Sequence, residues 1–382
     1  MEKEKTNKML QEVLNETAEI LRTGKTARKT KIGLTTLGSE IAPVELLRGA
    51  EIAMQREPGL EVSIIGPAPK YNLPVYEAGD EDEVHAILER LLDEKELDGV
   101  VTMHYPFPIG VATIGKVITP ARGKEMYIAS TTGTSDTDRI QAMVKNAVFG
   151  IAAAKADGIA NPTLGILNVD GARQVERYLN AMKSRGYDFS WGESQRADGG
   201  QILRGNDLIL GSVDIVLCDT LTGNILMKLF SSFNSGGDYE TTGYGYGPGV
   251  GENFDRLICI ISRASGSPVI AGAINYCASM VKGGLQQIAA NEIRKARQAG
   301  WKIPAPSAVA ADAGGEITPP PAKITGEQIP GIDILELEDA VKSLWKNEIF
   351  ASSGMGCTGP VILIADEDKE KALEILRANQ YL

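Results

Sequence analysis

The sequence predicts an α/β protein with a mostly parallel sheet that is covered by helices on both faces. Between residues 31 and 300, short and nearly continuous apolar runs alternate with longer segments of helical periodicity. Such uninterrupted runs are typical of strands buried on both faces by helices. With 382 residues, 43% of them hydrophobic, the chain has enough material for about two or three domain-sized units.

We divide the chain into an N-terminal helix (1–30), an α/β core (31–300), a linker (301–332) and a C-terminal unit (333–382). The first helix, Lys3–Arg22, has an apolar stripe that either the core or another subunit must cover. The strands of the core are expected at Ile32–Leu37, Val62–Gly66, Gly99–Met103, Met126–Ser130, Leu164–Asn168, Val213–Cys218 and Leu257–Ser262. Its helices are expected at Glu45–Glu57, Glu83–Leu92, Asp138–Ala156, Arg173–Arg185, Gly223–Phe233 and Val269–Gln298.

The segment from Lys302 to Pro330 is rich in proline, alanine and glycine, which predicts a linker or an extended arm. After it we expect a helix near Leu337–Lys346, a turn around Cys357, a strand at 361–365 and a helix at 369–378. A unit of about 50 residues is a marginal independent fold, so we expect it to dock on the core.

Composition excludes several classes of function. The net charge of −11, without a basic block, argues against nucleic-acid and anionic-membrane binding. No apolar stretch is long enough to span a bilayer, and the N-terminus lacks a signal-peptide core. Four cysteines without regular spacing and two histidines, His85 and His104, give little material for a disulfide framework, a metal site or a Ser-His-Asp triad. We therefore expect a cytoplasmic protein without a metal or a nucleotide cofactor.

Cys357 is the most informative single residue. It lies in the segment 354–360, with the sequence GMGCTGP, directly before an apolar strand. Glycines have no side chains that would cover a thiol, and they leave nearby backbone N–H groups accessible. Such N–H groups can stabilise a thiolate or the oxyanion of a thioester reaction. The alternative is a small residue in a tight turn. Glycines on both sides favour a functional thiol.

A second candidate site follows the strand that ends at Asp219. A helix is expected to begin near Thr222 as the N-cap, so that the N–H groups of Gly223 and Asn224 point at a bound anion. The amide of Asn224 is a further donor, and Lys228 lies one turn later. A capped βα turn without a ligand is the alternative, since sheets of this class contain many.

Two later segments extend this site. The glycine-rich run 236–251 contains Asp238 and is expected to be a loop shaped around a ligand or a subunit contact, because so many glycines oppose a core element. Arg263, Ser265 and Ser267 precede a long helix and offer a phosphate cradle of hydroxyl, N–H and guanidinium donors. Arg263 or Lys228 would balance the phosphate charge.

In this order, the motifs around Asp219, Lys228, Asp238 and Ser265 resemble the PlsX-type phosphate acyltransferase family over roughly residues 31 to 300. The resemblance implies a core like that of isocitrate and isopropylmalate dehydrogenases. It also implies acyl transfer between a thioester carrier and inorganic phosphate. Two departures from the pattern of this family indicate a different acyl donor. The segment 35–40 stands in place of an Asp-rich glycine turn, and the sequence has no histidine near Arg263.

Three further segments are similar to a narrower group, the component C alpha subunits of glycine, sarcosine and betaine reductases. They are the C-terminal segment 353–360, the segment 35–38 and the Tyr-Gly-Tyr-Gly-Pro-Gly stretch. This resemblance implies that Cys357 carries an acetyl thioester, which phosphate releases as acetyl phosphate. It further implies a hetero-oligomer with the component C beta subunit and the selenoprotein reductase components. Two alternatives stay open: an acyl-carrier-protein:phosphate acyltransferase of phospholipid synthesis without a covalent step, and a non-catalytic docking subunit.

Overall fold

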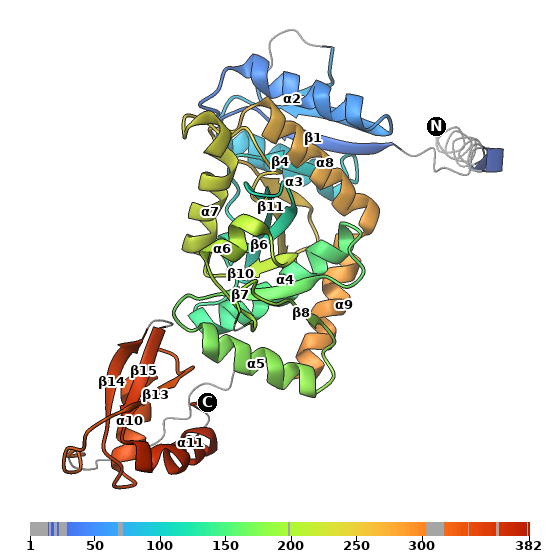
Figure 1. The fold of residues 1–382 in the computed structure, drawn as a ribbon. Coiled ribbons are helices and arrows are strands. Elements are labelled where there is room, and N and C mark those ends of the chain that lie inside the picture. The colour runs from blue at the N-terminus through green and yellow to red at the C-terminus, as the bar shows by residue number, and fades with distance from the viewer. Residues whose placement is uncertain are drawn as a thin grey trace.

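One large sheet forms the centre of the computed structural model (Figure 1). The structure describes residues 29–67, 72–197, 199–302, 317–334, 336–356, 359–379 and 381–382, and the isolated residues Leu14, Thr17, Ala18, Leu21 and Arg22. Those five residues are helical and exposed, and the rest of the predicted helix Lys3–Arg22 lies outside the described residues, as does the part 303–316 of the predicted linker.

Within the described part of the chain, twelve strands form this sheet in the order β3-β2-β1-β4-β12-β11-β5-β6-β10-β7-β8, with β9 beside β7. Neighbouring strands are parallel in both outer parts of the sheet, whereas β11 and β5 run antiparallel to their neighbours in the middle. The strands are β1 (Thr30–Thr35), β2 (Leu60–Ile65), β3 (Val75–Tyr76), β4 (Gly99–Thr102), β5 (Val111–Ile118), β6 (Glu125–Thr134), β7 (Thr163–Leu167), β8 (Ser190–Trp191), β9 (Ile202–Leu203), β10 (Ile215–Leu217), β11 (Gly247–Gly251) and β12 (Ile258–Ile260).

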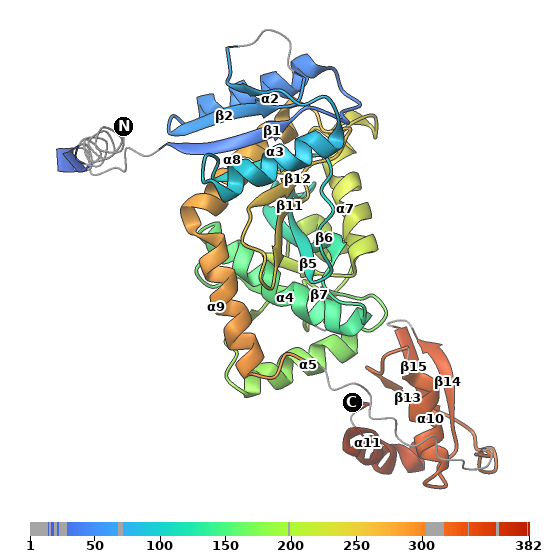
Figure 2. The same ribbon diagram turned by 180° about the vertical axis from the view of Figure 1, so that it is seen from behind.

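Helices cover both faces of the sheet and bury two apolar clusters against it. One face carries α2 (Pro43–Arg56), α4 (Arg139–Ala156), α5 (Ala172–Ser184), α8 (Ser267–Gly283) and α9 (Leu285–Gln298). The other carries α3 (Glu81–Asp93), α6 (Gly205–Leu210) and α7 (Thr220–Ser232), which the 3-10 turn η1 (Phe233–Ser235) follows. Figure 1 looks at the face with α2 and α8, and Figure 2 at the face with α3. The predicted fold class is confirmed.

The glycine-rich run contains the main error of the sequence analysis. We expected no core element there, but Gly247–Gly251 form the buried strand β11 between β12 and β5. Neighbouring groups pack closely on β11 because its glycines have no side chains. A Cβ on Gly249 would lie 2.4 Å from the Phe107 ring, and one on Gly247 would lie 1.7 Å from the carbonyl oxygen of Ile114. Glycine therefore makes this strand possible by allowing backbone and ring to approach it.

The helix predicted at Val269–Gln298 is two helices, because Gly284 adopts a left-handed φ of 67° between α8 and α9. This conformation is common at helix C-termini, where glycine ends the hydrogen-bonding pattern.

The C-terminal unit is a three-stranded antiparallel sheet packed on two helices. It contains β13 (Glu327–Pro330), α10 (Leu337–Trp345), β14 (Ala351–Gly356), β15 (Gly359–Ile364), the 3-10 turn η2 (Asp366–Asp368) and α11 (Lys369–Ala378). Strand β13 lies within the segment that we expected to be a linker. The side chains of this unit form an apolar cluster of their own. An ion pair between Arg177 of α5 and Glu336 joins the unit to the core.

Membrane spans and metal sites are both absent from the described residues. None of their helices combines the length and apolar character needed to cross a bilayer. Among the same residues, the histidine, cysteine and carboxylate side chains form no group that could hold a metal ion.

Candidate functional site

Three adjoining hollows surround Thr132 near the end of β6, and we call them together the Thr132 cleft. Their volumes are about 400, 320 and 260 Å³. The segment 131–136, the helix α7, the strand end at Ile260 and the loop after β4 form their walls. The polar and charged groups among the lining residues are Glu40, His104, Thr131, Thr132, Thr134, Ser135, Asp136, Thr220, Asn224, Lys228, Ser262 and Arg263.

Helix α7 presents one face to this cleft, since Thr220, Asn224 and Lys228 are spaced four residues apart. The helix begins at Thr220 and its N-cap is Asp219, whose carboxylate accepts the N–H of Thr222 at 3.1 Å and its hydroxyl at 2.6 Å. The prediction that Thr222 is the N-cap is therefore wrong. The Asp219 carboxylate, three residues before Thr222 and at the end of the strand, accepts these hydrogen bonds and is the cap.

The start of α7 also changes which N–H groups are free. The Gly223 N–H donates to the Asp219 carbonyl at 2.9 Å, and the N–H of Asn224 lies within the helix. Thr220 and Leu221, in the first turn, have no intrahelical acceptor for their N–H groups, and both residues line the cleft. The anion-binding end of this helix therefore lies one turn before the position that the sequence predicted.

Two hydrogen bonds and a close backbone approach hold α7 on β6. The Thr220 and Ser130 hydroxyl oxygens are 2.7 Å apart, and the Asn224 amide donates to the Thr131 carbonyl at 3.0 Å. Between them, a Cβ on Gly223 would lie 1.9 Å from the Ser130 carbonyl oxygen. Gly223 is thus needed for close packing of the helix on the strand.

Two cations line the same hollow as Asn224. The Lys228 ammonium lies 5.6 Å from the centre of the Tyr246 ring. Arg263 forms a 3.4 Å ion pair with Glu81, and its side chain is half exposed. Burial, together with the nearby Glu240 carboxylate, which accepts a hydrogen bond from the phenol, raises the pKa of Tyr246, so Tyr246 stays neutral beside Lys228. The structure therefore brings together three of the predicted site residues.

The remaining residues of this predicted site lie elsewhere. Ser265 donates its hydroxyl to Glu240 at 3.0 Å, and Ser267 donates to Glu45 at 2.6 Å, with both serines buried. These contacts brace the start of α8. Asp238 is exposed on the loop before β11 and is not among the described residues that line the cleft.

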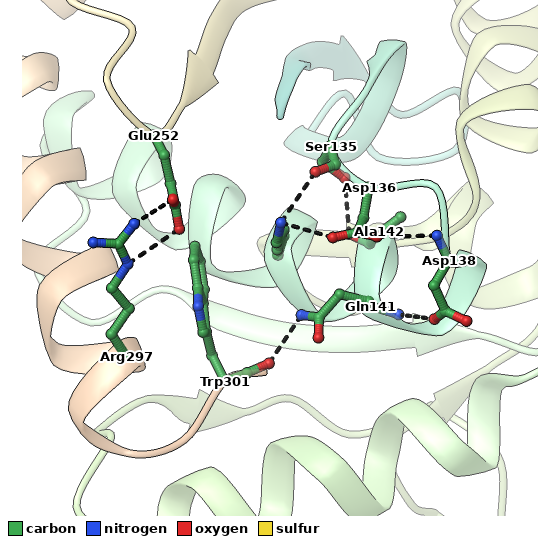
Figure 3. A network of polar contacts seen from close by, with 9 residues as sticks. Ser135, Asp136, Asp138, Gln141, Ala142, Glu252, Arg297 and Trp301 are labelled. Carbon is green, nitrogen blue, oxygen red and sulfur yellow. Dashed lines mark hydrogen bonds and ion pairs between the residues drawn. The ribbon is translucent and has the colours of Figure 1, made fainter. Parts of the chain in front are cut away.

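Ser135 and Asp136, just before α4, also line the cleft, and Figure 3 shows the polar contacts around them. The Asp138 carboxylate caps α4 by accepting the Gln141 N–H at 2.7 Å, and the Gln141 amide donates to the Trp301 carbonyl at 2.9 Å. An ion pair of 2.8 Å between Lys145 and Asp136 holds the segment 135–138 on the helix. A fixed backbone of this kind keeps the hydroxyls of the segment in place.

The hydroxyl-rich run of β6 is the part of the site that the sequence analysis missed. Ser130, Thr131, Thr132, Thr134 and Ser135 follow one another at the end of an apolar strand. Such a run at a strand end is a readable signal, because ligand sites of open α/β sheets form there.

The thiols of the described residues are buried. Cys218, Cys259 and Cys277 are each at most 1% exposed. Burial raises the pKa of the Cys218 and Cys259 thiols, so both stay protonated. Cys357 and Thr358 lie outside the described residues, between Gly356 and Gly359, which pair across β14 and β15.

The sequence comparisons give a family and named relatives. A family model described as "Fatty acid synthesis protein" matches residues 30–363. The chain is 47% identical over 373 residues, 97% of either chain, to the glycine/sarcosine/betaine reductase complex component C subunit alpha of Peptoclostridium acidaminophilum. It is 27% identical over 232 residues to the phosphate acyltransferase of Thermotoga maritima, which covers 52% of this chain and 68% of that relative.

Among solved structures, a branched-chain phosphotransacylase from Enterococcus faecalis V583 aligns with a TM-score of 0.44 at 13% identity, covering 66% of this chain and 99% of that one.

Proposed function

The chain belongs to the family of fatty acid synthesis proteins and, within it, to the component C alpha subunits of glycine/sarcosine/betaine reductases, and from this membership we propose that it transfers an acetyl group from a thioester on Cys357 to inorganic phosphate. The more distant phosphate acyltransferases support the acyl-to-phosphate part of this proposal. The alpha subunit of the reductase complex supports an acyl donor delivered by partner proteins.

One observation carries the proposal: Asn224, Lys228 and Arg263 line one hollow of the Thr132 cleft, although they come from two distant segments. An amide, an ammonium and a guanidinium are donors that phosphate prefers, and a helix N-terminus adds N–H groups nearby. We expect phosphate in this cleft.

The reaction needs only groups that the proposal names. A phosphate oxygen attacks the thioester carbonyl carbon, a C–O bond forms and the C–S bond breaks. The electron pair of that bond leaves with the Cys357 sulfur as a thiolate, and acetyl phosphate is released. The protein contributes by holding both partners and stabilising the oxyanion of the tetrahedral intermediate. No metal or redox cofactor takes part in these steps.

Elimination supports Cys357 as the carrier. The other three thiols are buried inside the core, and a thioester on any of them would need space that the packed side chains occupy. Cys357 lies outside the described residues, and in the sequence it falls between Gly356 and Gly359, which pair across β14 and β15.

We also propose that the chain works in a hetero-oligomer with the component C beta subunit and the selenoprotein components. The outer side of α7 supports a protein contact, because Leu221, Ile225, Leu229 and Phe233 follow at four-residue spacing and are each at least 49% exposed. A row of large apolar side chains on one helix is typical of an interaction surface.

The test is intact-mass spectrometry of the full chain after incubation with isotope-labelled acetyl phosphate. We expect one acetyl adduct, which peptide mapping assigns to Cys357 and which phosphate or arsenate discharges. Cys357→Ser should lose the adduct, whereas the matched control Cys277→Ala, at a buried thiol, should keep it.

The other outcomes separate the alternatives. Phosphate-dependent acyl transfer that survives in Cys357→Ser would indicate a phosphate acyltransferase without a covalent step. If the wild type carries no adduct even with the reductase components present, and still binds them, the chain is a docking subunit and the carrier proposal fails.

A further inference from the structure

A cavity of about 390 Å³ lies where the C-terminal unit meets the core. The turn from β7 to α5 and the segment 196–204 form its core side, and residues 330–334 with Pro360 form the other side. Figures 1 and 2 both show the C-terminal unit beside α5. Its described lining residues are all different from those of the Thr132 cleft. We call it the arginine cavity.

Arginines outnumber carboxylates in the lining of the arginine cavity, and one of them, Arg173, also forms a 2.9 Å ion pair with Glu176. Arg173, Arg196 and Arg204 line it, whereas the carboxylates among its described lining residues are Asp170 and Asp333. Each guanidinium has five N–H donors, so an arginine that already contacts a carboxylate keeps donors for a ligand. Three such groups in one concave site favour an anion that several of them can bind at once.

The N-terminus of α5 adds to this field. Its N-cap is Gly171, with a φ of 87°, and a glycine has no side chain to cap the first turn. A Cβ at this position would lie 2.2 Å from the Ile140 side chain, so glycine is required by space as well as by conformation. The N–H of Arg173, in the first turn, therefore has no intrahelical acceptor, and Arg173 lines the cavity at the positive end of a 13-residue helix.

A buried carboxylate holds the arginine-bearing segment in place. Asp207, 2% exposed, accepts the backbone N–H of Gln195 at 2.8 Å and that of Arg204 at 2.9 Å. It also accepts hydroxyls of two serines that flank the segment, Ser194 and Ser212. Hydrogen bonds to the Asp207 carboxylate therefore hold both ends of the segment. This arrangement fixes the arginine-bearing backbone in the absence of a ligand.

We propose that the arginine cavity is a second anion site and binds a phosphoryl group, from either inorganic phosphate or an acyl phosphate. The choice of a phosphoryl group over other anions rests on the proposed function, and the anion site itself rests on the geometry. Planar guanidinium groups match two oxygens of a phosphoryl group at once.

The position of the cavity gives this site a role in the proposed reaction. Pro360 lines it and follows Cys357 by three residues in the chain, whereas the described lining of the Thr132 cleft contains no residue of the C-terminal unit. The cavity therefore offers a phosphoryl group a place on the hairpin side of the core, in addition to the phosphate expected in the Thr132 cleft.

The test is isothermal titration of the full chain with inorganic phosphate and, separately, with acetyl phosphate. We compare Arg204→Met with Lys228→Met of the Thr132 cleft, and use Arg377→Met on α11 as the charge-matched control. We expect Arg204→Met to weaken one binding event about 10- to 100-fold. Arg204→Lys should weaken it less, and Arg377→Met should leave it unchanged. Thermal unfolding of each variant shows whether it is folded.

The results separate this inference from the proposed function. The inference is overturned if Arg204→Met is folded and binds both anions like the wild type. It is also overturned if Lys228→Met loses all phosphate binding while Arg204→Met keeps it. Arg204-dependent binding without any Cys357 adduct keeps the anion site and removes the proposed function. Competition between the two anions tells whether the site holds inorganic phosphate, the acyl phosphate or both, and each of these supports the site.

Discussion

The substitution Gly223→Ala tests how α7 is held on β6. An added Cβ would lie 1.9 Å from the Ser130 carbonyl oxygen, closer than real Cβ contacts by about 1 Å. The clash is with backbone, so no side chain can rotate away from it. Helix and strand must separate, which strains the hydrogen bonds that Thr220 and Asn224 make to β6.

The expected cost follows from these contacts. Overpacking costs about 1–3 kcal/mol, and two weakened hydrogen bonds add about 0.5–1.5 kcal/mol each. The better helix propensity of alanine returns up to about 1 kcal/mol. We therefore expect the free energy of unfolding to fall by about 1–5 kcal/mol, and the thermal midpoint by roughly 2–10 °C.

The assay is thermal and urea unfolding, followed by circular dichroism and tryptophan fluorescence. The matched control is Gly205→Ala in α6, where an added Cβ meets nothing within 4 Å and which we expect to change stability by at most about 1 kcal/mol. A Gly223→Ala variant as stable as the wild type, or a control that loses as much, would refute this account of the packing.

Two further substitutions test buried charges. Lys116, 7% exposed, contacts Asp157 and Glu125 at 2.7 Å each, so Lys116→Met leaves the buried Asp157 carboxylate without its cation. We expect a loss of about 3–5 kcal/mol in urea unfolding, and a loss under 1 kcal/mol would contradict this. For Asp207, burial alone would raise the pKa of the carboxyl, but the hydrogen bonds that it accepts lower that pKa below its usual range. Its contribution to stability is therefore complete above the ordinary carboxyl pKa near 4 and is lost as the pH falls through the lowered pKa of the folded state. Asp207→Asn should be less stable than the wild type at pH 7, with the difference shrinking in acid unfolding below about pH 4, and a pH-independent difference would count against this assignment.

Local patterns were enough to predict most of the core. Runs such as Ile32–Leu37 and Leu164–Asn168 lie within two residues of the bounds of β1 and β7, because strand burial on both faces leaves an apolar signature in consecutive residues. The amphipathic helices near α3, α5 and α10 were found for the same reason. The position of Cys357 between glycines and the motif around Asn224 were equally visible, since both are local in the chain.

Contacts between distant segments decided the rest. Strand β11 could not be predicted, because its glycines are explained only by the Phe107 ring and the β5 backbone that pack on them. The Thr132 cleft and the arginine cavity likewise join residues that lie far apart in the chain. The sequence alone therefore determined the elements and the chemistry available at each turn, whereas only the tertiary structure decided which cations share a hollow. The physical reason is that strand and helix signals are local, while a binding site depends on the strand order of the sheet.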